Sequence, residues 1–375
     1  QECGRGNAVF IHLTLLPYLR AAGELKTKPS QQSVGILRNI GIIPDFLVCR
    51  TEVPMEDDHF RKLALFCNVN QRYVIEERDV ANSIYEVPNE LAAQQLDVLV
   101  LEALGMPANE LDLTEWNKML AVVLDKSLPE VTIAVVGKYI SLKDAYKSIY
   151  EALDHGGIAN RVKVKIRMVE SQDFEDEEGF GMLEGVDGIL VPGGFGDRGI
   201  PGKLKAIQYA RENNIPFFGI CLGMQCAVIE FSRNVLGLAE ANSYEFDESS
   251  KDPVIALMDE QKKITNKGGT MRLGAWKCVL KEGTKAAKAY GCTRISERHR
   301  HRYEVNINYR EKLEGAGLTF SRLSPDGTLP EIVEIKDHPW FIGVQFHPEL
   351  KSKPFDPHPL FASFIEAALN QSRLV

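Results

Sequence analysis

Short apolar runs alternate with longer amphipathic stretches in the second half of the chain. The predicted strands are at 131–136, 162–168, 188–191 and 215–220, and helical patterns such as 142–153 and 224–231 lie between or after them. The run at 131–136 is continuously apolar, as in a strand that is buried on both faces. The run at 162–168 alternates basic with apolar residues, so we expect it nearer an edge. This order predicts an α/β fold: an open, mostly parallel sheet flanked by helices, with ligands at the carboxyl ends of its strands.

The first part of the chain shows the same alternation with fewer elements. Strands are predicted at 9–13 and 45–50, and helices at 33–39, 89–104 and 116–128. Asn89 is expected as the N-cap of the second helix. The run at 9–13 reads as a buried strand that lacks the sheet it should join, and the chain begins with Gln1, so we expect an N-terminal truncation. The pattern predicts three segments: part of an α/β domain at 1–112, a linker helix and linker at 113–130, and a second domain at 131–375.

Composition and charge narrow the class of protein. Of the 375 residues, 44% are hydrophobic and 26% are charged, as in a globular protein of two or three domains. The net charge of −8 argues against nucleic acid as a main partner, and no apolar run approaches the ~18 residues of a membrane span. The seven cysteines are odd in number and form no CxxC pair, which predicts neither a disulfide framework nor a zinc site and favours a cytoplasmic location.

A glycine frame surrounds one cysteine at the end of the last predicted strand. In Gly219–Gly223, a glycine stands two places on either side of Cys221, and a helical pattern follows. This is the pattern of a nucleophile elbow, with cysteine in place of serine. The glycines allow a sharp turn from strand to helix, and the N-terminus of a helix favours the thiolate form of a thiol. We therefore predict that Cys221 attacks an acyl or amide carbon, whereas Cys226, which lacks this frame, is expected in the core.

Two further segments supply the groups that such a nucleophile needs. Gly193–Gly196 follows a predicted strand, and the backbone N–H of Gly194, together with that of Leu222, would meet a developing oxyanion. A plain glycine turn is the alternative. His347 ends an apolar run and Glu349 stands two places on, so we predict an acid–base imidazole and the carboxylate that orients it.

These motifs resemble those of the class I glutamine amidotransferases over about residues 131–372. In that family the cysteine attacks the side-chain amide of glutamine, a glutamyl thioester forms, and ammonia passes through a tunnel to a partner domain. Further segments narrow the resemblance to the CTP synthase family: Lys26–Gln31, Asn242–Phe246, Gly268–Gly274 and Glu297–Asn306. The resemblance implies a ligase that aminates UTP to CTP with glutamine, ATP and Mg²⁺, with GTP as activator and a homotetrameric assembly.

The resemblance also assigns roles around glutamine. Cys221, His347 and Glu349 would be the catalytic triad. The glutamine-binding residues would be Gly194, Leu222, Gly223, Met224, Gln225, Glu245 and Arg302. Glu245 would pair with the α-ammonium and Arg302 with the α-carboxylate, because a buried zwitterion needs a partner for each charge. Residues 268–274 would form a lid that closes over the site and responds to GTP, and the adjacent glycines suit a hinge.

In the first unit the resemblance implies nucleotide contacts. The residues that contact UTP or CTP would be Lys26, Thr27, Lys28, Pro29, Ser30, Gln31 and Lys62. Lysines act as point charges for phosphate oxygens, and a helix start with proline in its first turn also offers free N–H groups. The ATP adenine would be bordered by Arg78, Asp79 and Val80.

Part of the family pattern has no counterpart in these residues. The sequence contains no G-x-x-x-x-G-K-[ST] phosphate loop, and we expect the Mg²⁺ ligands upstream rather than in this chain. The chain is therefore expected to keep a glutaminase half and an incomplete synthetase half. Two alternatives remain open: another acyl-transfer enzyme on the same scaffold, such as a γ-glutamyl hydrolase or an amidotransferase subunit of a different synthase, and a non-catalytic assembly or regulatory module.

Overall fold

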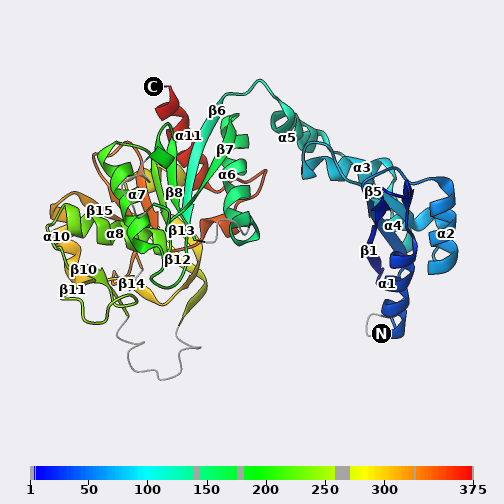
Figure 1. Cartoon of the computed structure of the whole chain (residues 1–375), viewed down its shortest axis with the longest axis horizontal. Coiled ribbons are helices and arrows are strands. Elements are labelled where there is room, and N and C mark those ends of the chain that lie inside the picture. Colours follow the sequence, from blue (N-terminus) through cyan, green and yellow to red (C-terminus); the bar gives the residue numbers. More distant parts are fainter. Residues whose placement is uncertain are drawn as a thin grey trace. The chain divides into compact units, whose positions relative to one another are not determined.

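The computed structural model describes residues 4, 6–138, 143–174, 181–257, 271–324 and 327–373. The chain divides into two compact units, Gln1–Lys126 and Ser127–Val375, each with strands and helices (Figure 1). Within the described ranges, no helix combines the length and the apolar character needed to cross a lipid bilayer. The predicted α/β class is confirmed.

The first unit is built on a three-stranded parallel sheet in the order β1-β4-β5. The strands of this sheet are β1 (Ile11–Leu16), β4 (Phe46–Thr51) and β5 (Val74–Arg78). Two short strands, β2 (Tyr18–Leu19) and β3 (Glu24–Leu25), pair with each other. The helices of this unit are α1 (Lys28–Asn39), α2 (Asp57–Cys67), α3 (Val87–Ala93), α4 (Leu96–Ala103) and α5 (Thr114–Leu124), with 3-10 turns at Gln71–Tyr73 and Ile84–Glu86. One apolar cluster joins the sheet to α1 and α2 through Val34, Leu47 and Leu63. A second cluster joins it to α4 through Phe46 and Leu99.

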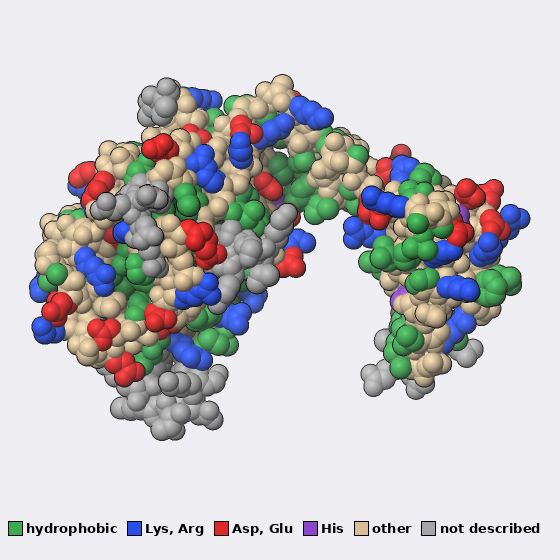
Figure 2. All heavy atoms as spheres, in the orientation of Figure 1, with side chains coloured by type: hydrophobic (Ala, Val, Ile, Leu, Met, Phe, Trp, Pro, Cys, Tyr) green, Lys and Arg blue, Asp and Glu red, His purple; other side chains and the backbone are tan. Residues whose placement is uncertain are grey.

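The strand predicted at 9–13 is found slightly later, at 11–16, and it is not buried on both faces. Thr14 and Leu16 point inward, whereas Ile11, Leu13 and Leu15 are exposed. Apolar side chains are correspondingly visible on the surface of this unit (Figure 2). The prediction of a buried strand is wrong for these residues because an apolar run does not reveal which of its faces is covered.

The single helix predicted at 89–104 is two helices, α3 and α4. Gln95 has a left-handed backbone, with φ of 58°, which ends the helical path. The side chain of the preceding Gln94 forms hydrogen bonds with both the N–H and the carbonyl of Glu76 on β5, so the end of α3 is tied to the sheet. Asn89 lies inside α3 instead of capping it, and its side chain donates to Asn117 on α5. Contacts with the sheet and with α5 therefore determine where the helices of this region begin and end.

The second unit is built on a nine-stranded sheet in the order β13-β12-β15-β16-β17-β9-β8-β6-β7, with a small sheet β10-β11-β14 beside it. The strands are β6 (Glu130–Gly137), β7 (Lys163–Glu170), β8 (Gly188–Val191), β9 (Phe217–Ile220), β10 (Ala241–Ser243), β11 (Asp252–Leu257), β12 (Arg272–Leu280), β13 (Arg294–His301), β14 (Tyr303–Val305), β15 (Leu318–Leu323), β16 (Pro330–Ile335) and β17 (Phe341–Val344). The helices are α6 (Lys147–Asn160), α7 (Ile200–Glu212), α8 (Leu222–Asn234), α9 (Lys285–Tyr290), α10 (Arg310–Gly315) and α11 (Pro359–Ser372), with 3-10 turns at Lys143–Tyr146, Ile307–Tyr309 and Pro348–Leu350. The strand predicted at 162–168 is the edge strand β7, as expected.

Helices cover both faces of the large sheet. On one face, α6 and α11 pack over a cluster that includes Ile133, Phe218 and Phe364. On the other face, α7 and α8 pack over sheet residues such as Phe217 and Ile189. This is the layer order of an α/β domain, and Figure 1 shows the sheet between its helices.

Parallel pairing brings five strand ends to one edge of this sheet. Strands β17, β9, β8, β6 and β7 are all parallel neighbours, so their carboxyl ends lie side by side. The residues that follow β8, β9 and β17 include Gly193, Cys221 and His347. The sheet topology therefore collects residues from three distant parts of the chain at one place.

Gly202 in α7 offers a test of this packing. A Cβ atom at this position would lie 1.7 Å from the backbone oxygen of Ser171, so an added methyl group would force the backbone to move. We expect Gly202→Ala to lower the free energy of unfolding by about 1–3 kcal/mol, although alanine is the better helix former. Urea titrations followed by tryptophan fluorescence measure this, since the core residue Trp340 belongs to the same unit.

Gly315→Ala is the matched control, because a Cβ atom at Gly315 in α10 would meet nothing within 4 Å. This variant should be unchanged or more stable by up to about 1 kcal/mol. Equal unfolding midpoints for the two variants would contradict the packing described for Gly202.

Candidate active site

The cysteine at the end of β9 has a backbone conformation that is rare for a residue with a side chain. Cys221 has φ of 51° and ψ of −104° and is the residue before the first turn of α8. Its N–H donates to the carbonyl of Val344 at 2.7 Å. A Cβ atom on Gly223 would lie 2.0 Å from the carbonyl oxygen of Val191, so only glycine permits the start of α8 to pack this closely on β8. The glycine frame thus allows the turn that carries the sulfur out of the sheet.

A histidine and a glutamate from another part of the chain lie beside this sulfur. The Nδ1–H of His347 donates to Oε1 of Glu349 at 2.7 Å, which leaves Nε2 for the side chain of Cys221. The main chain of His347 is held by a hydrogen bond from its N–H to the carbonyl of Arg298. Burial opposes the charge of this imidazole, but its hydrogen bonds with Cys221 and Glu349 raise the pKa of His347 to about 10. The arrangement favours an imidazolium next to the sulfur.

The turn after β8 lies against both groups. A Cβ atom on Gly193 would lie 3.0 Å from Cε1 of His347 and 3.3 Å from Cβ of Cys221. Two side chains hold this turn: Nζ of Lys138 donates to the carbonyl of Phe195 at 2.6 Å, and Glu245 accepts a hydrogen bond from the N–H of Gly196 at 2.9 Å. The backbone groups of the turn are therefore fixed close to the nucleophile.

Two cavities meet at Cys221. The larger, of about 460 Å³, is lined by residues that include Tyr146, Gly193, Cys221, Gly274, Arg298 and His347. The smaller, of about 40 Å³, is lined by Gly194, Phe195, Cys221, Gln225, Glu245, His301, Arg302 and Tyr303. The smaller cavity thus holds one carboxylate and one guanidinium. Within the described ranges, the Nε atom of Arg302 is buried without a hydrogen-bond partner, so this cavity suits a ligand that carries both a cationic and an anionic group.

The structure brings together most of the residues that the sequence suggested for glutamine. Gly194, Gln225, Glu245 and Arg302 line one cavity with Cys221. The side chains of Leu222 and Met224 are instead buried in the apolar clusters around α8, and Gly223 packs on β8. These three residues therefore offer only backbone groups to a ligand.

The proposed lid falls partly outside the described residues. Gly268, Gly269 and Thr270 are among those that the structure does not describe. Leu273 and Gly274, at the start of β12, line the larger cavity.

In the first unit, the residues suggested for UTP or CTP surround the start of α1. Lys28 is the first residue of this helix, Pro29 lies in its first turn, and no side chain caps it. The amide of Gln31 donates to the hydroxyl of Thr27. Ser30 differs from the others, since its buried hydroxyl bonds to Thr14 and to the carbonyl of Leu15.

Three charged residues suggested for nucleotide binding already have ionic partners. Lys26 pairs with Glu24 and Lys62 with Asp58. Asp79, which with Arg78 and Val80 lies at the end of β5, accepts a hydrogen bond from Arg50 at 2.7 Å. These are exposed pairs of small energetic value, so a phosphate would compete with them easily.

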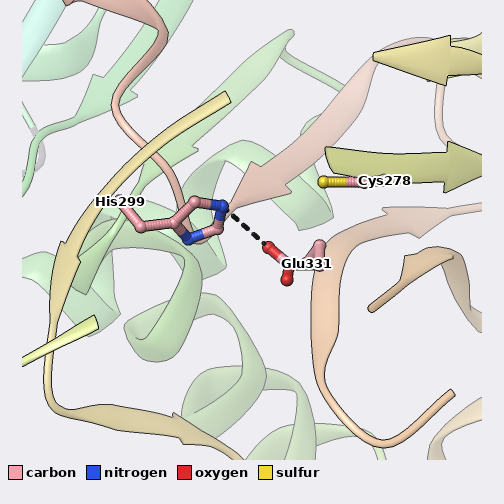
Figure 3. A group of neighbouring side chains, drawn as sticks. All are labelled: Cys278, His299 and Glu331. Carbon is pink, nitrogen blue, oxygen red and sulfur yellow. Dashed lines mark ion pairs between the residues drawn. The ribbon is translucent and has the colours of Figure 1, made fainter. Parts of the chain in front are cut away.

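Cys278, His299 and Glu331 form a buried group of possible metal ligands, with their ligand atoms within 4.8 Å of one another (Figure 3). Nε2 of His299 lies 3.2 Å from Glu331, but the same carboxylate also forms an ion pair with Arg272 at 2.6 Å. Burial and the charge of Arg272 lower the pKa of His299 to about 2. A cation would have to enter beside this guanidinium, so these residues fit a polar network of the interior and not a metal centre.

Several residues at the site were not singled out from the sequence. Lys138 follows β6 as Cys221 follows β9, so its position at a strand end was the available signal. Gln345 stands two residues before His347, on the same side of an extended segment. Its amide nitrogen lies 3.8 Å from Sγ of Cys221. Phe195 and Tyr303 gave no comparable signal.

Comparison with known proteins finds a matching family model for each of the two units. The family model described as CTP synthase N-terminus matches residues 1–106, and that described as glutamine amidotransferase class-I matches residues 141–367. A CTP synthase of Fibrobacter succinogenes is 56% identical over 374 residues, which are 99% of this chain and 66% of that protein. A CTP synthase of Nitrobacter hamburgensis is 58% identical over an alignment of 381 residues, which covers 99% of this chain and 70% of that protein. The chain thus spans about two thirds of the length of these relatives.

A solved structure extends the match to the fold. The glutaminase domain of Trypanosoma brucei CTPS with bound acivicin is 44% identical in sequence and superposes with a TM-score of 0.61. The superposition covers 64% of this chain and 94% of the solved domain. With two family models and relatives of this similarity over nearly all of its residues, the chain belongs to the CTP synthase family, and its second unit has the class I glutamine amidotransferase fold.

Proposed function

We propose that this chain hydrolyses glutamine with Cys221, His347 and Glu349, and that the ammonia serves the amination of UTP to CTP. The observation that carries the proposal is the arrangement at the end of β9. A nucleophile on a strained turn faces an imidazole that is held between the sulfur and a buried carboxylate. This is the order of groups that nucleophilic catalysis requires.

The first half of the reaction forms a thioester. The thiolate of Cys221 attacks the carboxamide carbon of glutamine, and the N–H groups of Gly194 and Leu222 stabilise the oxyanion. Loss of one such donor typically costs about 3 kcal/mol. The imidazolium of His347 then gives its proton to the amide nitrogen, the C–N bond breaks, and ammonia leaves.

The second half returns the enzyme to its starting state. Neutral His347 takes a proton from water, the hydroxide attacks the thioester carbon, and the thiolate of Cys221 leaves with glutamate as product. Glu349 keeps the imidazole oriented through both halves, because its hydrogen bond fixes the proton on Nδ1.

Glutamine would bind in the smaller cavity. Its α-ammonium would pair with Glu245 and its α-carboxylate with Arg302, whose buried Nε would then gain a partner. Gln225 and the backbone of the Gly223–Met224 segment would complete the contacts. The turn at Gly193–Gly196 links substrate and oxyanion sites, since Glu245 also binds the N–H of Gly196.

The wider activity is proposed from the family. Lys26, Thr27, Lys28, Pro29, Ser30, Gln31 and Lys62 would face UTP or CTP, and Arg78, Asp79 and Val80 would border ATP. The match of residues 1–106 to the synthase N-terminus supports these assignments. ATP with Mg²⁺, activation by GTP, a homotetramer and a cytoplasmic location complete the proposal. We further propose that these 375 residues retain the glutaminase half only, since they hold no phosphate loop and span about two thirds of the relatives.

Removal of the sulfur tests the nucleophile. Cys221→Ala should abolish glutamine hydrolysis, because the proposed thioester forms on this sulfur. The measurement is glutamate release from glutamine. Cys292→Ala, which removes an exposed thiol, should keep the wild-type rate. Glutamine hydrolysis by Cys221→Ala would show that the nucleophile is assigned wrongly, and slow reaction of the Cys221 thiol with diazo-oxo-norleucine would favour a non-catalytic role.

The charge of His347 provides a second test. Its pKa is raised to about 10 by Cys221 and Glu349 against the opposing effect of burial, so the imidazole should remain protonated through neutral pH and lose its proton only as the pH rises toward that value. Glu349→Gln removes one of these causes and should move the titration midpoint down, toward the ordinary value of about 6.5. NMR titration of isotopically labelled histidine measures the midpoint. We expect a loss of kcat by about tenfold to a hundredfold, and an unchanged midpoint would contradict the role of Glu349.

An assay of CTP synthesis tests the proposal that this chain retains only the glutaminase half. This chain, supplied with UTP, ATP, Mg²⁺ and ammonia, should form no CTP, because it contains no phosphate loop. Nucleotide separation by chromatography measures the product, and a complete CTP synthase is the positive control. CTP formation by this chain would refute the proposal of an incomplete synthetase half.

A further inference from the structure

A buried amide that the mechanism does not yet use lies beside the nucleophile. Gln345 follows β17, is fully buried, and places Nε2 3.8 Å from Sγ of Cys221. Its own backbone N–H donates to the carbonyl of Glu331 at 2.9 Å, so its position is fixed by the sheet. With Cys221 only 3% exposed, little water is available to stabilise a charge on the sulfur.

The direction of this amide follows from its neighbours. The carbonyl of Tyr303 can only accept, so the amide nitrogen of Gln225 must face it, at 2.9 Å. The same nitrogen lies 3.2 Å from Oε1 of Gln345 and donates to it. Since the oxygen of Gln345 is turned toward Gln225, its NH₂ group is turned toward the sulfur. A chain of three groups thus orients the last donor on Cys221.

We propose that Gln345 is a further catalytic residue, whose amide N–H donates to Sγ of Cys221 and stabilises the thiolate. The proposal rests on the proposed glutamine hydrolysis and adds a role to it. A hydrogen bond to an anionic acceptor is shorter and stronger than one to a neutral acceptor, and burial strengthens it further. The donor would therefore act both before attack, on the free thiolate, and when the thiolate leaves the thioester. No proton is transferred to or from Gln345.

Other charged groups also face the sulfur, and they stay in place when Gln345 is changed. His347 forms a hydrogen bond with it, and the buried ammonium of Lys203 on α7 interacts with it electrostatically. The other ionisable residues that line the two cavities are Tyr146, Glu245, Arg298, His299, Arg300, His301, Arg302, Tyr303 and Glu349. A comparison of variants at position 345 alone therefore isolates the effect of the amide.

The test compares Gln345→Met, which keeps the volume and removes the donor, with Gln345→Glu, whose carboxylate cannot donate when ionised. The first readout is the rate of alkylation of Cys221 by iodoacetamide between pH 5 and 10, after subtraction of the rate in Cys221→Ala. We expect Gln345→Met to move the midpoint of this profile upward by about one pH unit. Gln345→Glu should move it further, because it also adds a negative charge.

The second readout is glutamine hydrolysis. Gln345→Met should lower kcat/KM by about 10- to 100-fold, and the loss should be in kcat, because the amide touches the nucleophile and not the charged groups of glutamine. Gln208→Met is the matched control, since the Gln208 amide donates to exposed Glu212 on α7 at 3.0 Å and lines neither cavity at Cys221. It should leave both readouts unchanged.

The outcomes separate the two proposals. An alkylation midpoint that does not move in folded Gln345→Met overturns the role of Gln345. If Gln345→Met does not fold, Gln345→Asn decides in its place, because its shorter side chain draws the amide back from the sulfur. If the midpoint moves but the wild-type chain hydrolyses no glutamine, the thiolate contact stands and the proposed function fails.

Discussion

The turn at Cys221 is the constraint on which the rest of the site depends. A non-glycine residue with φ of 51° is strained, by about 1–3 kcal/mol in comparable cases. The surrounding packing stabilises it: the N–H of Cys221 bonds to Val344, and Gly223 allows α8 to lie against β8. A larger residue at 223 would push the helix away, and the sulfur would lose both its place at the helix start and its distance to His347. The strain is therefore a consequence of close packing at three strand ends.

The parallel order of the strands brings the other functional groups to the turn at Cys221. Because β17, β9 and β8 are neighbours, the chain after each strand reaches the same edge of the sheet. One end supplies the imidazole, the next the sulfur, and the third the glycine turn that Lys138 and Glu245 hold. The helices on both faces keep the strands in register, so the groups are positioned by the core of the unit and not by flexible loops.

Buried histidines of the same unit differ in their charge, although burial lowers the pKa of each of them. His299 and His301 lie in the interior beside Arg272, and their pKa values are lowered to about 2 and about 3, so both imidazoles are neutral. His347 is also largely buried, but its contacts with Cys221 and Glu349 raise its pKa to about 10. The partners, and not the depth of burial, decide which imidazole carries a proton. His301 lines the smaller cavity at Cys221 and His299 lines the larger one, while the charged imidazole of His347 suits the transfer of a proton.

The sequence alone determined the features that depend on near neighbours. The glycine spacing around Cys221, the strand before it and the helix after it were all readable, and so was the pairing of His347 with a carboxylate two residues away. The tertiary structure decided everything that depends on distant contacts. The helix expected at 89–104 breaks at Gln95 because Gln94 bonds to β5, and the strand at 11–16 leaves one face open. The amide of Gln345 turns toward the sulfur because the carbonyl of Tyr303 orients Gln225, and no local pattern records a chain of hydrogen bonds between residues so far apart in sequence.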